Sequence, residues 1–350
     1  MSVFSEFQGS RILVVGGAGF VGSNLCRRVL ESRPKELIVV DNLLSADSTN
    51  VPRDSAVTFV HGSITYEKVL CELPANLDYV FHLATYHGNQ SSIHDPLMDH
   101  ENNTLTTLKL FNRLAHMKSV KKVVYASAGC TVAEKTYEAR DAVDEDASIS
   151  LYHDTPYQIS KLIGEFYANY YFLRAGLPVV KARFQNVYGP GEILGAGRWR
   201  GTEHTIWRNV VPTFIWKALG QEALPVDNGG VATRDFVYVD DIVEGLIACA
   251  LNGGAGEVYN LASGVETSIR DLAEKINALT QNPKPLDIKP ARDWDRSGRR
   301  YGSTRKAHDK LGFQARVDLD TGLARTIEWT FENSDLIRRC IAQHGRFLQT

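Results

Sequence analysis

The chain has 350 residues, 43% of them hydrophobic, and a formal net charge of -2. It is long enough for one large or two medium domains with a full core, and its near-neutral charge argues against nucleic acid as a partner. The five cysteines are scattered without metal-binding spacing, and no apolar run approaches the ~20 residues that span a bilayer. We therefore expect a cytoplasmic protein that holds no metal and does not cross a membrane.

The first predicted elements are a strand at 12–15, a glycine-rich turn and a helical pattern at 25–30. Residues without a Cβ, such as Gly16, allow a tight turn and let a pyrophosphate approach the N–H groups at the helix start. A second apolar run ends in Asp41, close to the expected ~20 residues downstream, where a carboxylate binds the adenosine ribose and repels a 2′-phosphate. This order predicts an NAD site, the alternative being an ordinary turn followed by a solvated aspartate.

Further short apolar strands are predicted at 57–60, 79–83, 123–126 and 179–184, separated by helical stretches. Strands that are apolar on both faces fit a parallel sheet covered by helices on each side. The predicted fold is therefore an α/β, Rossmann-like, doubly wound sheet, with the site at the carboxyl ends of its strands.

Past Asn186 the rhythm changes, with a helix expected around 212–220, strands at 235–239 and 258–261, and helices at 268–280 and 320–333. We interpret 1–186 as the NAD-binding domain, with some later segments returning to it. Residues 187–350 then form mainly a smaller α/β lobe that binds substrate.

Tyr157 and Lys161 lie one turn apart on a helix that Thr155 caps and Pro156 begins. An isolated phenol has a pKa of about 10, and an adjacent ammonium and a nicotinamide ring favour its charged form. A phenolate placed there takes a proton from a substrate hydroxyl while a hydride leaves the same carbon. The alternative for this pair alone is a solvated surface position.

Several segments together resemble the extended short-chain dehydrogenase/reductase family, and specifically its nucleotide-sugar epimerases and dehydratases. The resemblance covers nearly the whole chain and implies that bound NAD oxidises a sugar, which rearranges as a ketone and is reduced again. The segments are 16–23, His82-Leu83-Ala84, Tyr157 with Lys161, 183–190 (RFQNVYGP), 234–241 (RDFVYVDD) and 260–264.

The resemblance also implies roles for individual positions. The turn, including Phe20 and Val21, would bind the pyrophosphate, while Ser63 departs from the aspartate that the family usually places beside adenine. Arg234 and Arg292 would grip the substrate phosphates as guanidinium forks. The cofactor positions are Gly16, Gly19, Phe20, Val21, Gly22, Asp41, Asn42, Ser63, Ile64, Leu83, Ala84, Thr85, Asn103, Tyr157 and Lys161, and Asn186 would contact the sugar diphosphate.

The largest departure from the family is at Ala128, where a catalytic serine or threonine is usual. Alanine cannot hydrogen-bond the sugar hydroxyl. Ser127 and Thr131 are the nearest substitutes, and a water acting with Tyr157 and Lys161 is the third option.

Gly129 and Cys130 stand where the family's dehydratases have an Asp-Glu pair, and where its decarboxylases have glutamate, so both chemistries are disfavoured. Cys130 matches the proton-transfer cysteine of GDP-mannose 3,5-epimerases, but their partner lysine would align near Gly195. A catalytic thiol and a small buried cysteine therefore both stay open.

The stretch 191–209 is longer than in many relatives and carries Arg198 and Arg200. It could close over the substrate, with arginines on phosphate or a sugar carboxylate, form a dimer contact, or stay a solvated loop.

These observations predict an NAD-dependent NDP-sugar epimerase that acts through a transient 4-keto sugar in surface polysaccharide precursor synthesis. The resemblance also implies a homodimer, with helices around 105–117 and 157–173 paired across a two-fold axis. The alternatives are an NDP-sugar dehydratase or net oxidoreductase, and a non-catalytic NAD-binding regulator.

Overall fold

The computed structural model describes residues 7–132, 136–138, 141–193, 209–292 and 298–344, except for the side chains of Cys130, Gln343 and His344. Its centre is a seven-stranded sheet in the order β10-β6-β5-β4-β1-β2-β3. Every neighbouring pair in it is parallel, which confirms the predicted doubly wound sheet. The strands are β1 (Arg11–Val15), β2 (Glu36–Asp41), β3 (Val57–His61), β4 (Tyr79–His82), β5 (Lys122–Ala128), β6 (Val179–Phe184) and β10 (Val258–Leu261).

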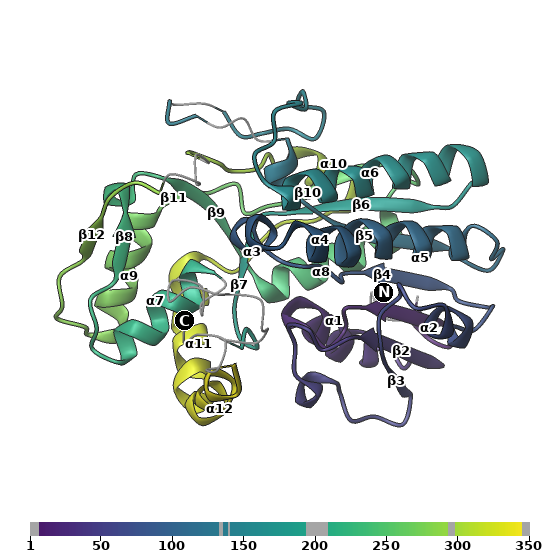
Figure 1. Cartoon of the computed structure of the whole chain (residues 1–350), viewed down its shortest axis with the longest axis horizontal. Coiled ribbons are helices and arrows are strands. Elements are labelled where there is room, and N and C mark those ends of the chain that lie inside the picture. The colour runs from purple at the N-terminus through teal and green to yellow at the C-terminus, as the bar shows by residue number, and fades with distance from the viewer. Residues whose placement is uncertain (1–6, 133–135, 139–140, 194–208, 293–297, 345–350) are drawn as a thin grey trace.

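Helices cover both faces of this sheet (Figure 1). Successive residues of β1 point to opposite faces: Ile12 and Val14 belong to one core cluster, Leu13 and Val15 to the other. Because both faces are covered, each strand is apolar throughout, which is why the apolar runs of the sequence located them. The first face carries α1 (Phe20–Leu30), α8 (Val239–Asn252) and α10 (Arg305–Leu311), and the second carries α2 (Glu67–Glu72), α5 (Thr106–Leu114) and α6 (Pro156–Ala175).

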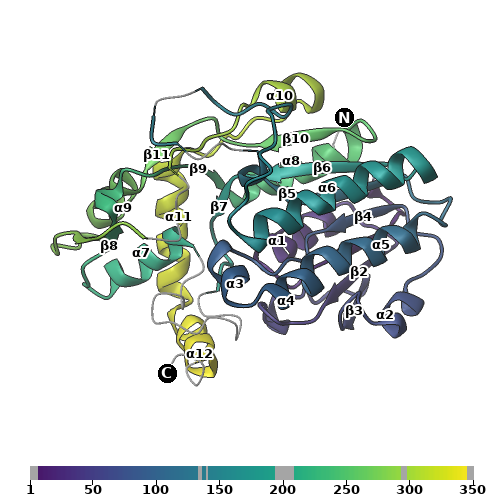
Figure 2. The same cartoon turned by 45° about the horizontal axis from the view of Figure 1, so that its top comes forward.

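A smaller lobe lies beside the sheet, on the left in Figure 1, with its own core around Phe214, Leu272 and Leu323. Its helices α7 and α9 pack together, and α11 packs on both. Figure 2 shows the long α11 standing upright beside α7, with α12 at its lower end. The lobe contains α7 (Val210–Leu219), α9 (Ile269–Thr280), α11 (Leu319–Glu332), α12 (Ser334–His344), the pair β8 (Pro225–Asp227) and β12 (Asp287–Lys289), and the sheet of β11 (Glu266–Ser268), β9 (Thr233–Tyr238) and β7 (Asn186–Tyr188).

Short helical segments connect these elements. One of them, η3, is π-helical and continues directly into α5, a geometry that is often found beside functional sites. The segments are η2 (Ser48–Asn50), α3 (Asn89–His94), α4 (Pro96–Asp99), η3 (His100–Leu105), η4 (Gly129–Thr131) and η6 (Asn228–Gly230). No helix in the described part of the chain is both long and apolar enough for a membrane crossing.

A buried ion pair joins α6 to β6 at the edge of the site. The Arg183 guanidinium donates to both carboxylate oxygens of Glu165, at 2.8 Å each, and both side chains are almost fully buried. Arg183 also donates to the Glu145 carbonyl oxygen at 2.7 Å. The pair therefore fixes the position of α6 against the sheet. Removing one partner would destabilise the fold by about 3–5 kcal/mol, because the other charge would stay buried without a partner.

His82 ends β4 beneath the site and is almost fully buried, with its Nε2 2.9 Å from the Thr107 hydroxyl. Burial, and secondarily the positive charge of Lys161, lowers the pKa of His82 from 6.5 to about 3. The unfolded chain therefore binds a proton between these two pH values and the folded chain does not. The neutral histidine's contribution to stability is complete above pH 6.5 and is lost as the pH falls toward about 3.

We predict that the free energy of unfolding falls by about 1.4 kcal/mol for each pH unit below the pKa that His82 has in the unfolded chain. Proton uptake by His82 in the unfolded chain alone causes this loss. Urea unfolding at about pH 7.5 and about pH 5 measures this, with His82→Asn as the matched control, because asparagine does not titrate there. The native protein should lose about 2 kcal/mol more than the variant over this interval. Equal losses would show that His82 is protonated in the folded state.

Candidate active site

The glycine turn packs backbone directly on backbone. Gly16 has φ +86°, and a Cβ on it would lie 2.5 Å from the Ala84 nitrogen. A Cβ on Gly22, in the first turn of α1, would lie 2.1 Å from the Gly16 carbonyl oxygen. Gly19 is the N-cap of α1, and the first turn carries no acidic side chain. The start of α1 therefore presents backbone N–H groups with no acidic side chain in the helix's own first turn, which fits a pyrophosphate.

Asp41 ends β2 next to this turn and braces it. Its carboxylate accepts from the Ala18 backbone N–H at 3.0 Å and from the Leu43 N–H at 2.9 Å. Each carboxylate oxygen can accept more than one hydrogen bond, so ribose hydroxyls can still be bound. Asn42 donates to Asn102 at 3.2 Å, which fixes the loop after β2. These residues fit the adenosine half of NAD.

A cavity of about 380 Å³ runs from the glycine turn to the smaller lobe. It opens at the carboxyl ends of β1, β4 and β5, at the point where the strand order reverses, as expected for this type of sheet. The sequence-predicted residues that line it are Gly16, Gly19, Phe20, Val21, Gly22, Asp41, Asn42, Ser63, Ile64, Leu83, Ala84, Thr85, Ser127, Tyr157, Lys161, Asn186, Arg234 and Arg292.

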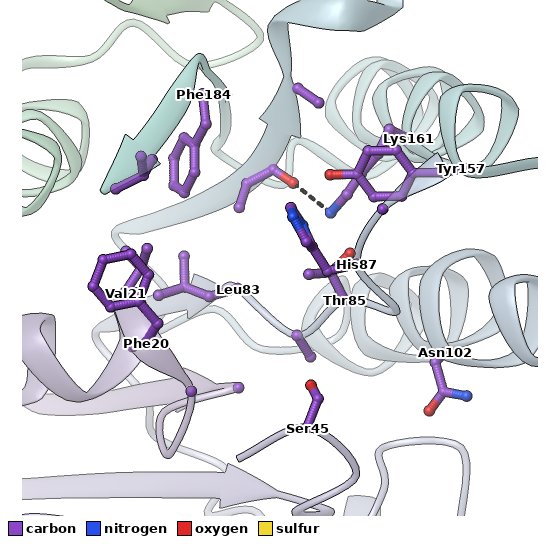
Figure 3. Close-up of a pocket in the computed structure, with 18 of the residues that line it drawn as sticks. Phe20, Val21, Ser45, Leu83, Thr85, His87, Asn102, Tyr157, Lys161 and Phe184 are labelled. Atoms are coloured by element: carbon purple, nitrogen blue, oxygen red, sulfur yellow. Dashed lines mark hydrogen bonds between the residues drawn. The ribbon is translucent and has the colours of Figure 1, made fainter. Parts of the chain in front are cut away.

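Tyr157 and Lys161 meet at the wall of this cavity (Figure 3). Thr155 accepts from the Gln158 N–H and so begins α6 at the position that the sequence predicts. The Lys161 ammonium donates to the Ala126 carbonyl oxygen at 2.9 Å and lies 5.9 Å from the centre of the Tyr157 ring. A buried cation is thus held at the end of β5, next to the phenol whose anion it would stabilise.

The hydroxyl groups nearest to Ala128 are engaged within the protein. Ser127 lines the cavity, but its hydroxyl donates to Glu165 Oε1 at 2.5 Å. Thr131 is fully buried, does not line the cavity, and donates to the Ala128 carbonyl oxygen at 2.8 Å because η4 turns it back on its own chain. The side chain of Cys130 lies outside the described part of the structure, as do Arg198 and Arg200.

Asn103 lies behind the cavity wall and does not line it. Its side chain accepts from the Tyr86 N–H at 2.7 Å and the Thr85 hydroxyl at 3.0 Å, and donates to Asp99 at 2.7 Å and to Ser160 at 3.2 Å. It therefore joins η3, the loop after β4 and α6, and would support the cofactor site through Thr85 without a direct contact.

The arginines of the smaller lobe reach the far end of the cavity. Arg234 donates to the carbonyl oxygens of Thr233 and Gly298, the latter at 2.9 Å, and Arg292 pairs with Asp227 at 2.5 Å. Arg300 lines the same end. This concentration of positive charge opposite the glycine turn fits a second diphosphate, that of a nucleotide sugar.

Sequence reasoning did not find all of the cavity's polar residues. His87 lies beside Tyr157 and Lys161, with its ring 5.8 Å from that of Tyr157 (Figure 3). Asn209 donates to Glu192 at 2.6 Å, which leaves its amide oxygen to accept from His87 Nε2 at 3.2 Å. The only sequence signal for His87 is that it follows the predicted strand at 79–83 by a few residues, at the sheet edge where ligands bind. Gln185 and Arg300 were also missed.

Comparison with known proteins identifies the class. The model of the NAD dependent epimerase/dehydratase family matches residues 12–262. The chain belongs to this family, and it is an enzyme whose cofactor is NAD. This confirms the family resemblance and the cofactor that the sequence predicted.

Individual relatives span almost the whole chain. The crystal structure of WbmF from Bordetella bronchiseptica in complex with NAD+ and UDP is 57% identical, has a TM-score of 0.87, and is matched over 98% of this chain and 99% of that one. A UDP-glucose 4-epimerase of Mycolicibacterium smegmatis is 31% identical, over 91% of this chain and 98% of its own length. A dTDP-glucose 4,6-dehydratase of Streptomyces antibioticus is also 31% identical, over 92% of both.

We predict that Gly22→Ala weakens NAD binding at least about tenfold and destabilises the fold by about 2–3 kcal/mol, because the new methyl group displaces the Gly16 carbonyl. Calorimetric titration with NAD and thermal unfolding measure the two effects. Gly9→Ala is the control: no atom lies within 4 Å of its new Cβ, although Gly9, unlike the helical Gly22, has a positive φ of +71°. Undiminished NAD affinity in Gly22→Ala would place the dinucleotide elsewhere.

Proposed function

We propose that this enzyme is an epimerase of nucleoside-diphosphate sugars and that it acts through a transient 4-keto sugar. Within this class, we propose UDP-sugars as its substrates. The observation that carries the proposal is the Lys161 ammonium, fixed by the Ala126 carbonyl oxygen beside Tyr157, in the cavity that the glycine turn begins. The UDP in the 57% identical WbmF structure supports a uridine nucleotide. We further propose a cytoplasmic enzyme whose product feeds surface polysaccharide synthesis, since activated sugars are donors for glycan assembly.

The proposed chemistry needs one acid/base group. Bound NAD supplies a hydride acceptor that later returns the hydride. The Tyr157 phenolate accepts the proton of the C4 hydroxyl, and Lys161 stabilises the negative charge that this requires. Arg234 and Arg292 hold the diphosphate while the ketone presents its other face. Tyr157 then returns the same proton to the new alcohol.

Epimerisation is favoured over dehydration by the segment after β5. Loss of water needs a further group that moves protons at the neighbouring carbon, and Gly129 has no side chain to do so. Cys130 would become such a group if the epimerised carbon were C3 or C5, and we retain this as the alternative site of proton transfer.

We predict that Tyr157→Phe lowers kcat about 10²- to 10⁴-fold, because the proton-transfer group is removed while the glycine turn and Asp41 still bind NAD. Purified protein is incubated with UDP- and dTDP-sugars in heavy water, and the products are identified by NMR. Tyr152→Phe, at a tyrosine that is 91% exposed, is the control. C4 epimerisation puts no deuterium on carbon, whereas deuterium at C3 or C5 would support Cys130 as the acid/base.

Other outcomes separate the competing functions. Stoichiometric release of NADH would indicate net oxidation, and a 4-keto-6-deoxy product would indicate dehydration. A protein that binds NAD but converts no sugar, with Tyr157→Phe indistinguishable from the native chain, would be a regulator.

We also propose a homodimer through α6. Its exposed apolar side chains recur on one face: Ile159 (43% exposed), Phe166 (54%), Tyr170 (54%) and Leu173 (77%). The neighbouring Leu97, on α4, is 81% exposed. A second copy that pairs its own α6 with this face would remove all of these side chains from water.

We predict that Phe166→Glu converts a dimer into a monomer, because it places a charge in the centre of the proposed interface. Sedimentation velocity measures the mass. Phe331→Glu, at an exposed phenylalanine (70%) of α11 in the smaller lobe, should leave the dimer intact. A native chain that sediments as a monomer would refute this interface.

A further inference from the structure

Gln185 is the single residue between β6 of the main sheet and β7 of the three-stranded sheet. In the register of β5 with β6, Ala128 pairs with Phe184, so Gln185 follows directly opposite Gly129. Its side chain lines the cavity together with Tyr157 and Lys161. The chain thus places an amide next to the position at which the expected hydroxyl is missing.

Two glycines form a slot for this amide. A Cβ on Gly129 would lie 2.3 Å from Gln185 Nε2 and 2.7 Å from its Oε1. A Cβ on Gly302 would lie 2.7 Å from the same nitrogen. Gly302 is itself anchored, because its N–H donates to Asp235 at 3.2 Å. The amide therefore rests on backbone that comes from two distant parts of the chain, and any larger residue at Gly129 would displace it.

The Gln185 amide has hydrogen-bonding capacity that the described residues do not use. No hydrogen bond to its side chain occurs within the described ranges, although it offers two N–H donors and one carbonyl acceptor. By contrast, the Ser127 and Thr131 hydroxyls donate to Glu165 and to the Ala128 carbonyl oxygen. Of these three polar side chains around Ala128, Gln185 is the one whose donors remain for a ligand in the cavity.

We propose that Gln185 binds the sugar ring of the substrate and orients the reacting carbon, in place of the hydroxyl that is missing at Ala128. An amide both donates to and accepts from a hydroxyl, and its N–H groups suit an N-acyl oxygen equally well. It does not exchange a proton at neutral pH, so Gln185 positions the sugar and Tyr157 alone carries the proton. This inference rests on the proposed function, because it requires a sugar in the cavity.

The test compares UDP with UDP-glucose, UDP-N-acetylglucosamine and UDP-glucuronic acid by titration calorimetry. Tyr157→Phe is the background, so that turnover does not interfere. Gln185→Met keeps an unbranched side chain of similar length and removes the amide. We expect UDP affinity within about twofold of the parent and a 5- to 20-fold loss, roughly, for the sugar that the parent binds best.

Two further variants distinguish a sugar contact from a structural role. Gly129→Ala should reproduce the loss, because its methyl group meets only the flexible end of Gln185 among its nearest neighbours. Ala128→Ser, combined with Gln185→Met, should recover at least about half of the lost binding free energy, because it restores a hydroxyl donor beside the sugar. With Tyr157 intact, the same variants should raise KM and lower kcat, and the added serine should reverse both.

Equal weakening of UDP and UDP-sugar by Gln185→Met, or no weakening of either, would overturn the inference. The inference would also be overturned if the Tyr157→Phe background bound UDP and all three UDP-sugars with equal affinity, since Gln185 would then make no contact with a sugar. The proposed function fails separately: it fails if the native chain binds a UDP-sugar more tightly than UDP but produces no epimer.

Discussion

The site depends on how closely the backbone approaches itself at the glycine turn. Gly22 rests on the Gly16 carbonyl, and Gly16 rests on the backbone of Ala84, with no room for a Cβ at either contact. These contacts bring α1, β1 and the end of β4 together at the point where the strand order reverses. The Asp41 carboxylate then binds the Ala18 N–H, so the same turn is fixed from β2. The geometry that admits a dinucleotide is therefore also what closes this corner of the fold.

A second constraint determines which hydroxyls the site can use. The buried pair of Arg183 and Glu165 holds α6, and thereby Tyr157 and Lys161, against the sheet. Glu165 also accepts the Ser127 hydroxyl, which completes the hydrogen bonding of a buried carboxylate. Turning Ser127 toward a substrate would remove this bond from a charge that water cannot reach. The ion pair that positions α6 thus engages the hydroxyl of the serine nearest to Ala128.

Much of the fold, and most of the residues that line the candidate cofactor site, could be predicted because the signals are local. The glycine turn, Asp41, and Tyr157 with Lys161 each depend on residues a few positions apart, or on one strand following another. The helix expected at 320–333 is observed at Leu319–Glu332, because its cap Asp318 is a local signal as well. The partners of Ser127 and Gln185 could not be predicted in this way. They depend on strand register and on contacts such as Gln185 with Gly302, which lies more than a hundred residues further along the chain.

The proposed replacement of a hydroxyl at position 128 by the Gln185 amide bears on the type of reaction. A serine at position 128 could relay a proton between the sugar and the phenol, whereas an amide can only hold the sugar in place. In the proposed reaction, proton transfer would then rest on Tyr157, whose neighbour Lys161 is fixed by the Ala126 carbonyl oxygen. Apart from the hydride that NAD would accept and return, inversion at C4 through a ketone requires that one oxygen lose and regain a proton. Dehydration, or inversion at C3 or C5, also moves a proton on carbon and needs another acid/base. The Tyr157, Lys161 and Gln185 arrangement suffices for the first reaction, which is the chemical reason for preferring a C4-epimerase among the reactions known in this family.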